Sequence, residues 1–573
     1  MRSLPGRRQW GPSVCSPALF DLFASTSLPV PAAVELHIEI TSGCTMARKD
    51  KDRLRNLVLV FGDQLSENLK AFNGFDARND AVLMMEVEEE ATYVPQHKIR
   101  IALFFAAMRH FAQRLRDKGT NVLYSYIDDK DNRGSFEKEI TRWIHKTRPR
   151  KLVCTLPGDH RVKETVKRIA AELDFGLEIR DDNHFLVSAE EFSEFARGKK
   201  SLLLEHFYRH MRRRYGILMD DGQPVAGKWN FDQENRQSFG KEGPAKIKAP
   251  RSFRPDESTE AVLKLVNNRF SDSPGSLDKF DYPVSRKQAL EALRDFINYR
   301  LPDFGPYQDA MFEGFPYLYH SRLSCALNLH LLTPQEVIKA VVKAYEKGQA
   351  PINSVEGFVR QVLGWREFIR GIYWLKMPEY AQRNELQAEL PMPAFMWTAE
   401  TEMNCIRQCV SQLIVHGYAH HIQRLMVMGL FSLLLGVNPY EVHQWHLSMY
   451  VDAIDWVSLP NVLGMSQYAD GGFVATKPYA ASGNYIQRMS NYCQNCFFNP
   501  RERLGELACP FNSLYWDFLF RNQDKLEGNH RMRMQYRNLD RIESSDRRKI
   551  QTRADELKKQ FTRKTYLVSH PNK

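Results

Sequence analysis

Cysteines near the C-terminal end of the chain have the spacing of a metal or iron–sulfur site. Cys493 and Cys496 form a Cys-x-x-Cys pair, and Cys509 follows with a proline directly behind it. Such a turn can place two thiolates on one metal ion or cluster. A fourth ligand is needed, and Cys405 and Cys409 are the candidates because an apolar helical pattern follows both. A redox pair or three unrelated buried thiols would give the same pattern.

A group of histidines could supply acid–base chemistry. His416, His420 and His421 lie in the segment HGYAHHIQRLM. Helical spacing predicts that His416 and His420 share one face and that His421 lies about 100° away. Imidazole exchanges a proton near neutral pH, so these side chains would act as acid or base if they face a pocket. Core packing and metal binding are the alternatives.

Two segments after the histidines are more polar and aromatic than ordinary core. Residues 442–472 combine polar and aromatic side chains and show few apolar repeats. Residues 475–490 form a loop of small residues. Such a loop lets the backbone approach a ligand, and its aromatic side chains can stack on a base or ring. The side chains concerned are Trp445, Asp452, Trp456, Asn461, Tyr479 and Tyr485.

The elements before these segments alternate between strand and helix. Helical patterns at 97–119, 135–149 and 162–176 separate short apolar runs, which predicts a doubly wound parallel sheet. The predicted strands are 56–61, 81–87, 121–128, 151–157 and 177–182.

Ligands of such a sheet bind at the C-terminal ends of its strands. That rule points to Asp63 and Gln64 after the first strand and to residues 86–90, which end at Glu90, after the second. Ordinary turn chemistry would also explain Asp63 and Gln64. The sequence has no Gly-x-Gly-x-x-Gly dinucleotide fingerprint.

Five regions are expected along the chain. Residues 286–530 have helical periodicity without strand alternation, which predicts an all-α domain after the α/β domain. Residues 1–54 differ in composition, and we expect a disordered extension or a true start at Met46. The predicted regions are the extension 1–54, the α/β domain 55–189, an interdomain linker 190–285, the helical domain 286–530 and a charged tail 531–573.

Composition narrows the class of protein. The net charge of +11 over 573 residues favours an anionic partner such as nucleic acid. The longest apolar run, 425–437, is shorter than the roughly 20 residues of a membrane span. Nine cysteines, clustered at one end, argue against a disulfide framework and for a reducing compartment.

Several segments together resemble the photolyase/cryptochrome superfamily, most closely its iron–sulfur branch of bacterial (6-4) photolyases and related cryptochromes. The resemblance runs from about residue 55 to about residue 530. It implies an α/β antenna domain followed by an all-α domain that holds FAD. The segments are NLVLVFGDQLS, EEATYV, GKWNFD, HSRLS, VRQVLGWREFIRG, YAHHIQRLMV, LPNVLGMSQYADGG and TKPYAASGNYI.

The resemblance implies FAD, a [4Fe-4S] cluster and a 6,7-dimethyl-8-ribityllumazine antenna as cofactors. The cluster ligands would be Cys405, Cys493, Cys496 and Cys509, which leaves Cys409 as a packing residue. The flavin contacts would be Ser321, Ser324, Gln361, Arg366, Asp452 and Asn461, and the antenna contacts Asp63, Gln64 and Glu90.

The resemblance also implies an activity, the light-driven repair of (6-4) photoproducts in UV-damaged DNA by a lyase. His421 would donate a proton with His420 beside it, and Trp445 and Trp397 would carry electrons to the flavin. Tyr479, Tyr485 and Met465 would line the lesion pocket. We expect a monomer in the bacterial cytoplasm, at the nucleoid and without a membrane partner. Organellar targeting by residues 1–54 is the less favoured expectation.

Two positions depart from the pattern of this branch. His446 stands where an aromatic residue between Trp445 and Trp397 is expected, and Ser458 replaces a carboxylate. Imidazole is harder to oxidise than indole or phenol, so light activation of the flavin could be slowed. A cryptochrome-type photoreceptor with weak or no repair is therefore the alternative function. An iron–sulfur DNA-binding protein without photochemistry is the third.

Overall fold

A five-stranded parallel sheet forms the first part of the chain. In the computed structural model, residues 53–199, 201–240, 242–244 and 246–563 are described, so the predicted extension lies outside them apart from residues 53 and 54. The strand order is β3-β2-β1-β4-β5, as expected for a doubly wound sheet. The strands are β1 Asn56–Leu59, β2 Asp80–Met85, β3 Val122–Ser125, β4 Lys151–Thr155 and β5 Gly176–Arg180.

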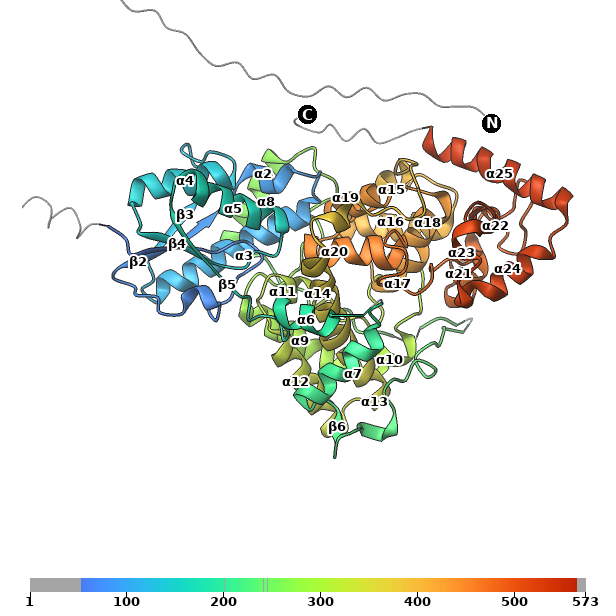
Figure 1. Cartoon of the computed structure of the whole chain (residues 1–573), viewed down its shortest axis with the longest axis horizontal. Helices are drawn as coiled ribbons and strands as arrows, with labels where there is room; N and C mark the ends of the chain where they lie inside the picture. Colours follow the sequence, from blue (N-terminus) through green and yellow to red (C-terminus); the bar gives the residue numbers. More distant parts are fainter. Residues whose placement is uncertain (1–52, 200, 241, 245, 564–573) are drawn as a thin grey trace, which may run out of the picture. The chain divides into compact units, whose positions relative to one another are not determined.

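Alternate residues of the strands face two different cores. Val58 and Val82 belong to the core that contains α3 (Lys98–Asp117), and α8 (Glu257–Arg269) packs on that helix. Leu57 and Leu83 belong to the other core. The helices on that second face are α4 Phe136–Thr147 and α5 His160–Glu172 (Figure 1). The sheet is thus covered on both faces, as parallel sheets require.

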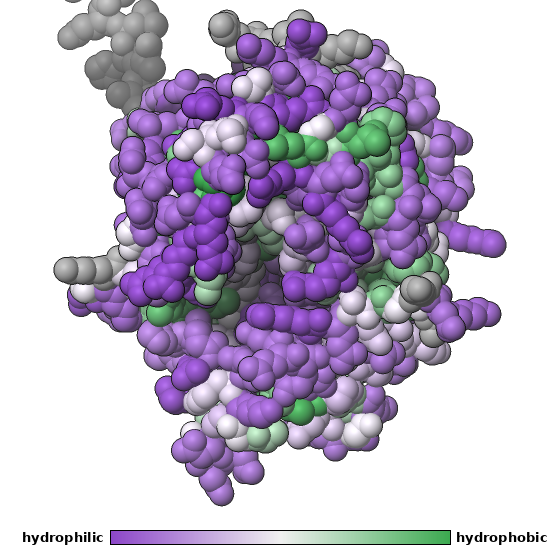
Figure 2. Space-filling model, turned by 90° about the vertical axis from the view of Figure 1, so that its right-hand side faces the viewer, coloured by the Kyte–Doolittle hydropathy of each residue, from purple (hydrophilic) through white to green (hydrophobic). Residues whose placement is uncertain are grey.

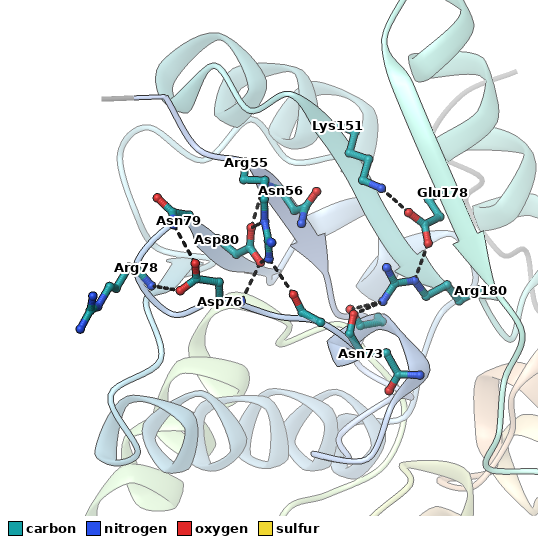
Figure 3. A network of polar contacts seen from close by, with 12 residues as sticks. Arg55, Asn56, Asn73, Asp76, Arg78, Asn79, Asp80, Lys151, Glu178 and Arg180 are labelled. Atoms are coloured by element: carbon teal, nitrogen blue, oxygen red, sulfur yellow. Dashed lines mark hydrogen bonds and ion pairs between the residues drawn. The ribbon is translucent and has the colours of Figure 1, made fainter. Parts of the chain in front are cut away.

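Charged side chains secure the N-terminal edge of the sheet. Arg55 donates from Nε to Asp80 Oδ1 over 2.9 Å, and the backbone N–H groups of Asn56 and Asp76 donate to the same carboxylate (Figure 3). Asp80 is buried, so these donors compensate for its desolvation. The network lies opposite the strand ends where a ligand is expected.

The predicted linker folds onto its neighbours. It contains α6 (Ala189–Ala196), α7 (Leu204–Tyr215) and α8, together with a short hairpin of β6 (Met219–Asp220) and β7 (Gln223–Pro224). Helix α7 packs on the segment η3 (Arg360–Arg366), where a Cβ at Gly364 would lie 3.1 Å from the Tyr208 ring. The absence of a side chain at Gly364 therefore permits this close approach.

From Arg286 onward the described residues form helices joined by loops (Figure 1). The first half contains α9 Arg286–Tyr299, α10 Leu301–Tyr307, α11 Ser324–Asn328, α12 Pro334–Glu346, α13 Ile352–Val359, α14 Glu367–Lys376, α15 Phe395–Thr398 and α16 Asn404–His416. The second half contains α17 His421–Gln423, η5 Arg424–Gly429, α18 Leu430–Leu435, α19 Pro439–Met449, α20 Asp455–Pro460, η6 Asn461–Ser466, α21 Gly483–Met489, α22 Pro510–Arg521, α23 Gln523–Leu526, α24 Arg533–Asp540 and α25 Ser544–Thr562.

The charged segment after residue 530 folds into helices as far as the described residues extend. Helix α25 buries Ile550, Ala554 and Leu557 and packs against α22. These apolar residues recur at helical spacing among charged neighbours, so the helix covers the core with one face and meets water with the other.

The surface of the molecule is polar on the side viewed in Figure 2, which shows a mostly hydrophilic face with a hollow near its centre. Within the described ranges, no helix combines the length and apolarity needed to cross a lipid bilayer.

Candidate functional site

The helical part encloses a cavity of about 300 Å³, here named the main cavity. The π-helical segments η3, η5 and η6 each contribute to its wall, together with residues 320–328. A π-helical turn shifts side chains out of α-helical register, and such turns occur frequently at functional sites. The volume lies at the lower end of typical ligand pockets.

All six residues expected to contact FAD line the main cavity together. Ser321 lies just before α11 and Ser324 is its first residue, whereas the others come from segments far away in sequence. His420 and His421 also contribute to the wall. The remaining predicted residues that line it are Gln361, Arg366, Asp452, Asn461 and Met465.

The loop that carries the two serines is fixed by Arg322. This residue has a left-handed φ of 58°, and its guanidinium donates to Asp281 over 2.6 and 3.2 Å. The guanidinium also lies over the rings of Tyr282 and Tyr317, 4.3 and 4.4 Å from their centroids. These contacts hold a strained backbone in place, as is common in ligand-binding loops.

The predicted shared helix face of His416 and His420 is wrong. Helix α16 ends at His416, because Gly417 takes a left-handed φ of 58°, and α17 begins only at His421. His416 instead contacts Tyr317 Oη through Nδ1 at 3.1 Å, away from the main cavity. His420 and His421 face the cavity because the chain turns there.

The histidines at the main cavity favour their neutral form. Burial, with the nearby charges of His320, His421 and Arg424, lowers the pKa of His420 well below its ordinary value. The His421 side chain is exposed within the cavity. Desolvation by the surrounding protein, followed by the positive charge of Arg424, nevertheless lowers its pKa to about 4. Proton donation by His421 therefore requires a bound group that favours its charged form.

Several buried polar atoms at the main cavity have no hydrogen-bond partner among the described residues. Both ring nitrogens of His420, Nε2 of His446, and Nε and Nη1 of Arg366 make no hydrogen bond, although Nη1 lies 3.7 Å from Glu367 Oε1. Buried polar groups are normally satisfied by protein or ligand, so this group of atoms indicates a polar ligand.

Arg424 is a cavity residue that sequence reasoning missed. Its guanidinium donates to both oxygens of Asp452 over 3.0 and 3.1 Å and lies 4.0 Å from the centroid of the Tyr450 ring. Its position three residues after His421 would put both side chains on one side of a helix, which is the signal that could have found it. Trp365 was also missed; its Nε1 donates to Asn461 Oδ1 over 2.8 Å.

The aromatic residues proposed to carry electrons do not line the main cavity. Trp445 is 1% exposed and does not line the cavity, whereas its neighbours His446 and Tyr450 do. Trp445 Nε1 donates to the carbonyl of Met396 over 3.0 Å, which links it to the residue before Trp397. Trp397 is half-buried at the end of α15.

The tyrosines expected in the lesion pocket are not part of the main cavity wall. Tyr479 is 38% exposed and Tyr485 is half-buried. Arg531 and Arg236 lie near Tyr479, where their charges lower its pKa against the larger raising effect of burial. The Arg488 guanidinium lies 5.8 Å from the centroid of the Tyr485 ring.

A second cavity, the sheet-edge cavity, lies at the C-terminal ends of the strands and has a volume of about 100 Å³. Asp63, Glu90 and Asp159 line it, and burial raises the pKa values of Asp63 and Asp159 to about 7. Arg161 donates to both oxygens of Glu90 over 2.7 and 2.9 Å. Gln64 does not line the cavity; its Nε2 donates to the carbonyl of Leu156 over 2.9 Å.

Four of the cysteines from the sequence analysis surround one small cavity. Cys405, Cys493, Cys496 and Cys509 line it, whereas Cys409 does not. Burial, followed by the neighbouring thiols, raises the pKa of Cys493 to about 12. In the described part of the chain, no three or more His, Cys, Asp or Glu side chains are grouped closely enough to hold a metal ion.

Solved structures of low sequence identity share the fold. A class III photolyase from Agrobacterium tumefaciens superposes with a TM-score of 0.52 at 16% identity, covering 89% of this chain and 98% of that protein. A cryptochrome from Synechocystis gives a TM-score of 0.51 at 12% identity, covering 89% and 99%.

Sequence comparison identifies closer relatives. Residues 58–282 match the model of the deoxyribodipyrimidine photo-lyase-related protein family. A (6-4) photolyase from Agrobacterium fabrum is 49% identical over 487 residues, which cover 84% of this chain and 95% of that protein. The chain therefore belongs to the photolyase/cryptochrome superfamily and, within it, to the family of this bacterial (6-4) photolyase.

Proposed function

We propose that this protein is a (6-4) DNA photolyase, a lyase that repairs (6-4) pyrimidine photoproducts in UV-damaged DNA with blue light. The observation that carries the proposal is the 49% identity to a (6-4) photolyase across 95% of that protein. The main cavity supports it, because the histidines expected to act on the lesion line the same space as the residues expected to bind flavin.

FAD fits the residues of the main cavity. The nitrogens of Arg366 that make no hydrogen bond are donors suited to phosphate or carbonyl oxygens, and His420 and His446 offer further polar atoms. When bound, reduced FAD supplies an electron on excitation by blue light. The residues that would hold it are Ser321, Ser324, Gln361, Arg366, Asp452 and Asn461, with Met465 beside them.

The chain's own residues would orient the reactants and move a proton. Arg424 holds the carboxylate of Asp452 in one position through two hydrogen bonds. His421 would give a proton to the hydroxyl on the 5′ base of the lesion, so that this oxygen can leave and return to the 3′ base. The phosphates of bound DNA raise the pKa of a nearby imidazole, which would bring His421 into its charged form.

DNA would bind beside the tyrosines, with the damaged base flipped out of the duplex. Tyr479 and Tyr485 lie close to arginines, and the whole chain carries a net charge of +11. Aromatic rings stack on bases and arginines neutralise phosphates, so binding should weaken as salt concentration rises. Light activation would pass through Trp445 and Trp397, with His446 beside Trp445.

We also propose a [4Fe-4S] cluster on Cys405, Cys493, Cys496 and Cys509. Their common cavity supports this assignment. A cluster of several iron and sulfur atoms holds its ligands farther apart than one ion does, so thiols too dispersed for one ion are compatible with it. The raised thiol pKa values mean that cluster binding would release protons and be coupled to folding.

A lumazine antenna is proposed for the sheet-edge cavity. Asp63 and Glu90 line it, and Gln64, which makes a backbone contact nearby, has its Oε1 unpaired. We further propose the boundaries 55–189, 190–285 and 286–530 for the antenna domain, linker and catalytic domain.

The decisive experiment uses duplex DNA with one defined lesion, either a (6-4) photoproduct or a cyclobutane dimer. The reduced protein is illuminated with blue light, and a dark sample serves as the control. We expect light-dependent repair of the (6-4) photoproduct to undamaged bases. Flavin binding and photoreduction without repair of either lesion would instead support the photoreceptor function, for which His446 beside Trp445 is the specific observation.

A further inference from the structure

Two buried side chains and one half-buried carboxylate form a continuous hydrogen-bonded chain. His443 Nε2 lies 3.0 Å from Asp455 Oδ1, and His443 Nδ1 lies 3.3 Å from Ser458 Oγ. Both ring nitrogens are therefore occupied, one by a carboxylate and the other by a hydroxyl. Ser458 is one of the two positions at which the resemblance leads us to expect a different residue.

Local structure explains why one imidazole reaches both partners. Asp455 and Ser458 are three residues apart in α20, so their side chains lie on one face of that helix. Helix α19, which carries His443, packs against α20. His443 is 2% exposed and Ser458 5%, so bulk water has little access to either.

The chain of hydrogen bonds joins two cavities. Ser458 lines the main cavity and Asp455 lines the sheet-edge cavity, whereas His443 lines neither. Asp455 also accepts a hydrogen bond from Tyr373 Oη, and Tyr373 Oη accepts one from the backbone N–H of His160 over 2.8 Å. The carboxylate is thus fixed from both sides.

Asp455 and the neighbouring Asp159 differ in which form of the carboxyl group burial and nearby charges favour. Burial alone would raise the pKa of Asp455, but the hydrogen bond and charge of His443 outweigh it, so the pKa lies below its ordinary value. The neighbouring Asp159 has a pKa raised to about 7 by burial and by Asp455. Asp455 therefore remains the charged partner of the pair.

We propose that Asp455, His443 and Ser458 form a proton relay that delivers one proton into the main cavity through the Ser458 hydroxyl. The acceptor is a basic ring nitrogen of a reduced flavin, so this inference rests on the proposed function. A carboxylate at position 458 would place its own charge at the cavity. A serine hydroxyl is neutral, and it can give up its proton only if a second group supplies it with another proton. His443 is that group.

The transfer conserves protons and requires no electrons from these residues. Ser458 gives its Oγ proton to the acceptor and takes the Nδ1 proton of the His443 imidazolium in the same step. His443 becomes neutral and keeps the proton on Nε2, which remains hydrogen-bonded to Asp455. Asp455 stays a carboxylate. The reverse transfer restores the imidazolium when the acceptor loses its proton.

The first test needs neither light nor flavin. Nitrogen-15 NMR of histidine-labelled protein reports which ring nitrogen carries a proton, and His443→Gln identifies the His443 signals by difference. Ser458→Ala should shift the Nδ1 resonance, and Asp455→Asn should shift the Nε2 resonance. If neither variant changes the His443 signals, the hydrogen-bonded chain does not exist in solution and the inference fails.

The second test measures proton delivery in the flavin-loaded protein. The absorption spectrum during photoreduction separates arrival of the electron from arrival of the proton at the flavin. Ser458→Ala should slow proton arrival by about tenfold or more while electron arrival is unchanged. Ser458→Thr keeps the hydroxyl and should restore the rate, and wild type should be slower in D₂O.

Ser448→Ala is the matched control. Ser448 is a buried serine of α19 whose Oγ donates only to the carbonyl of Gln444, over 2.8 Å, so its removal tests general loosening of the helix. Equal slowing by Ser448→Ala and Ser458→Ala, or no slowing by Ser458→Ala, would overturn the relay. A protein that binds no flavin would overturn the proposed function instead, while the NMR result still decides whether the hydrogen-bonded chain exists.

Discussion

The imidazole rings of His320 and His420 are stacked, with centroids 4.4 Å apart and planes inclined by only 9°. One ring comes from the segment before Ser321 and the other from the turn before His421. The contact therefore joins the proposed flavin-binding loop to the residue directly before the proposed proton donor. Burial, followed by the charge of His421, lowers the pKa of His320 to about 3, so the stack is uncharged at neutral pH.

Replacing His421 should abolish repair without releasing the flavin. His421→Ala removes the proposed proton donor, and we expect the yield of (6-4) repair per absorbed photon to fall by about 100-fold or more. Flavin absorption of the purified variant measures cofactor retention. His416→Ala is the control, because His416 contacts Tyr317 and lies outside the main cavity. Unchanged repair by His421→Ala would exclude this residue as the donor.

Breaking the pair between Arg424 and Asp452 should destabilise the protein. Arg424→Met leaves a buried carboxylate without its bidentate partner, which costs about 3–5 kcal/mol. Thermal unfolding of the single variants and of Arg424→Met with Asp452→Asn gives the coupling energy as a double-mutant cycle. Additive effects of the two substitutions would show that the pair contributes no coupling.

The cysteines at positions 405 and 409 should differ although both are buried in α16. Cys405→Ala removes a proposed cluster ligand, so we expect loss of iron and of the broad visible absorption of the cluster. Cys409→Ala removes a thiol of the same size that does not line the cysteine cavity, and iron content should stay at the wild-type level. Equal iron content in both variants would contradict the ligand assignment.

His97 should make the protein less stable in acid. Burial lowers its pKa to about 4, while its ring accepts the backbone N–H of Ile99 and contacts the carbonyl of Ile414 at 2.9 Å. In the unfolded chain His97 binds a proton near pH 6.5, whereas in the native protein it stays neutral until about pH 4. The free energy of unfolding therefore falls as pH falls from 6.5 towards 4. The loss from this residue is about 3 kcal/mol.

His97→Asn tests this pH dependence. Asparagine retains an acceptor at the start of α3 but cannot titrate, so the variant should be less stable at pH 7 and lose less stability on acidification. Urea unfolding at pH 7 and pH 5 measures both effects. An unchanged difference between the two pH values would show that His97 does not contribute.

The sequence alone determined the local architecture. Apolar runs of strand length alternate with helical periodicity, and these two patterns report directly which side chains are buried, so the parallel sheet could be predicted before its neighbours were known. The spacing of Cys493, Cys496 and Cys509 likewise predicted that these thiols lie together, because residues close in sequence are close in space. Family resemblance, rather than spacing, selected Cys405.

Only the tertiary structure decided which distant residues meet. Helical periodicity put His416 and His420 on one face, but the left-handed backbone of Gly417 ends the helix between them. Arg424 pairs with Asp452, and His443 contacts both Asp455 and Ser458, because separate segments of the chain pack together. Such contacts depend on the conformations of loops and on the angles at which helices cross. Local sequence patterns do not determine either of these.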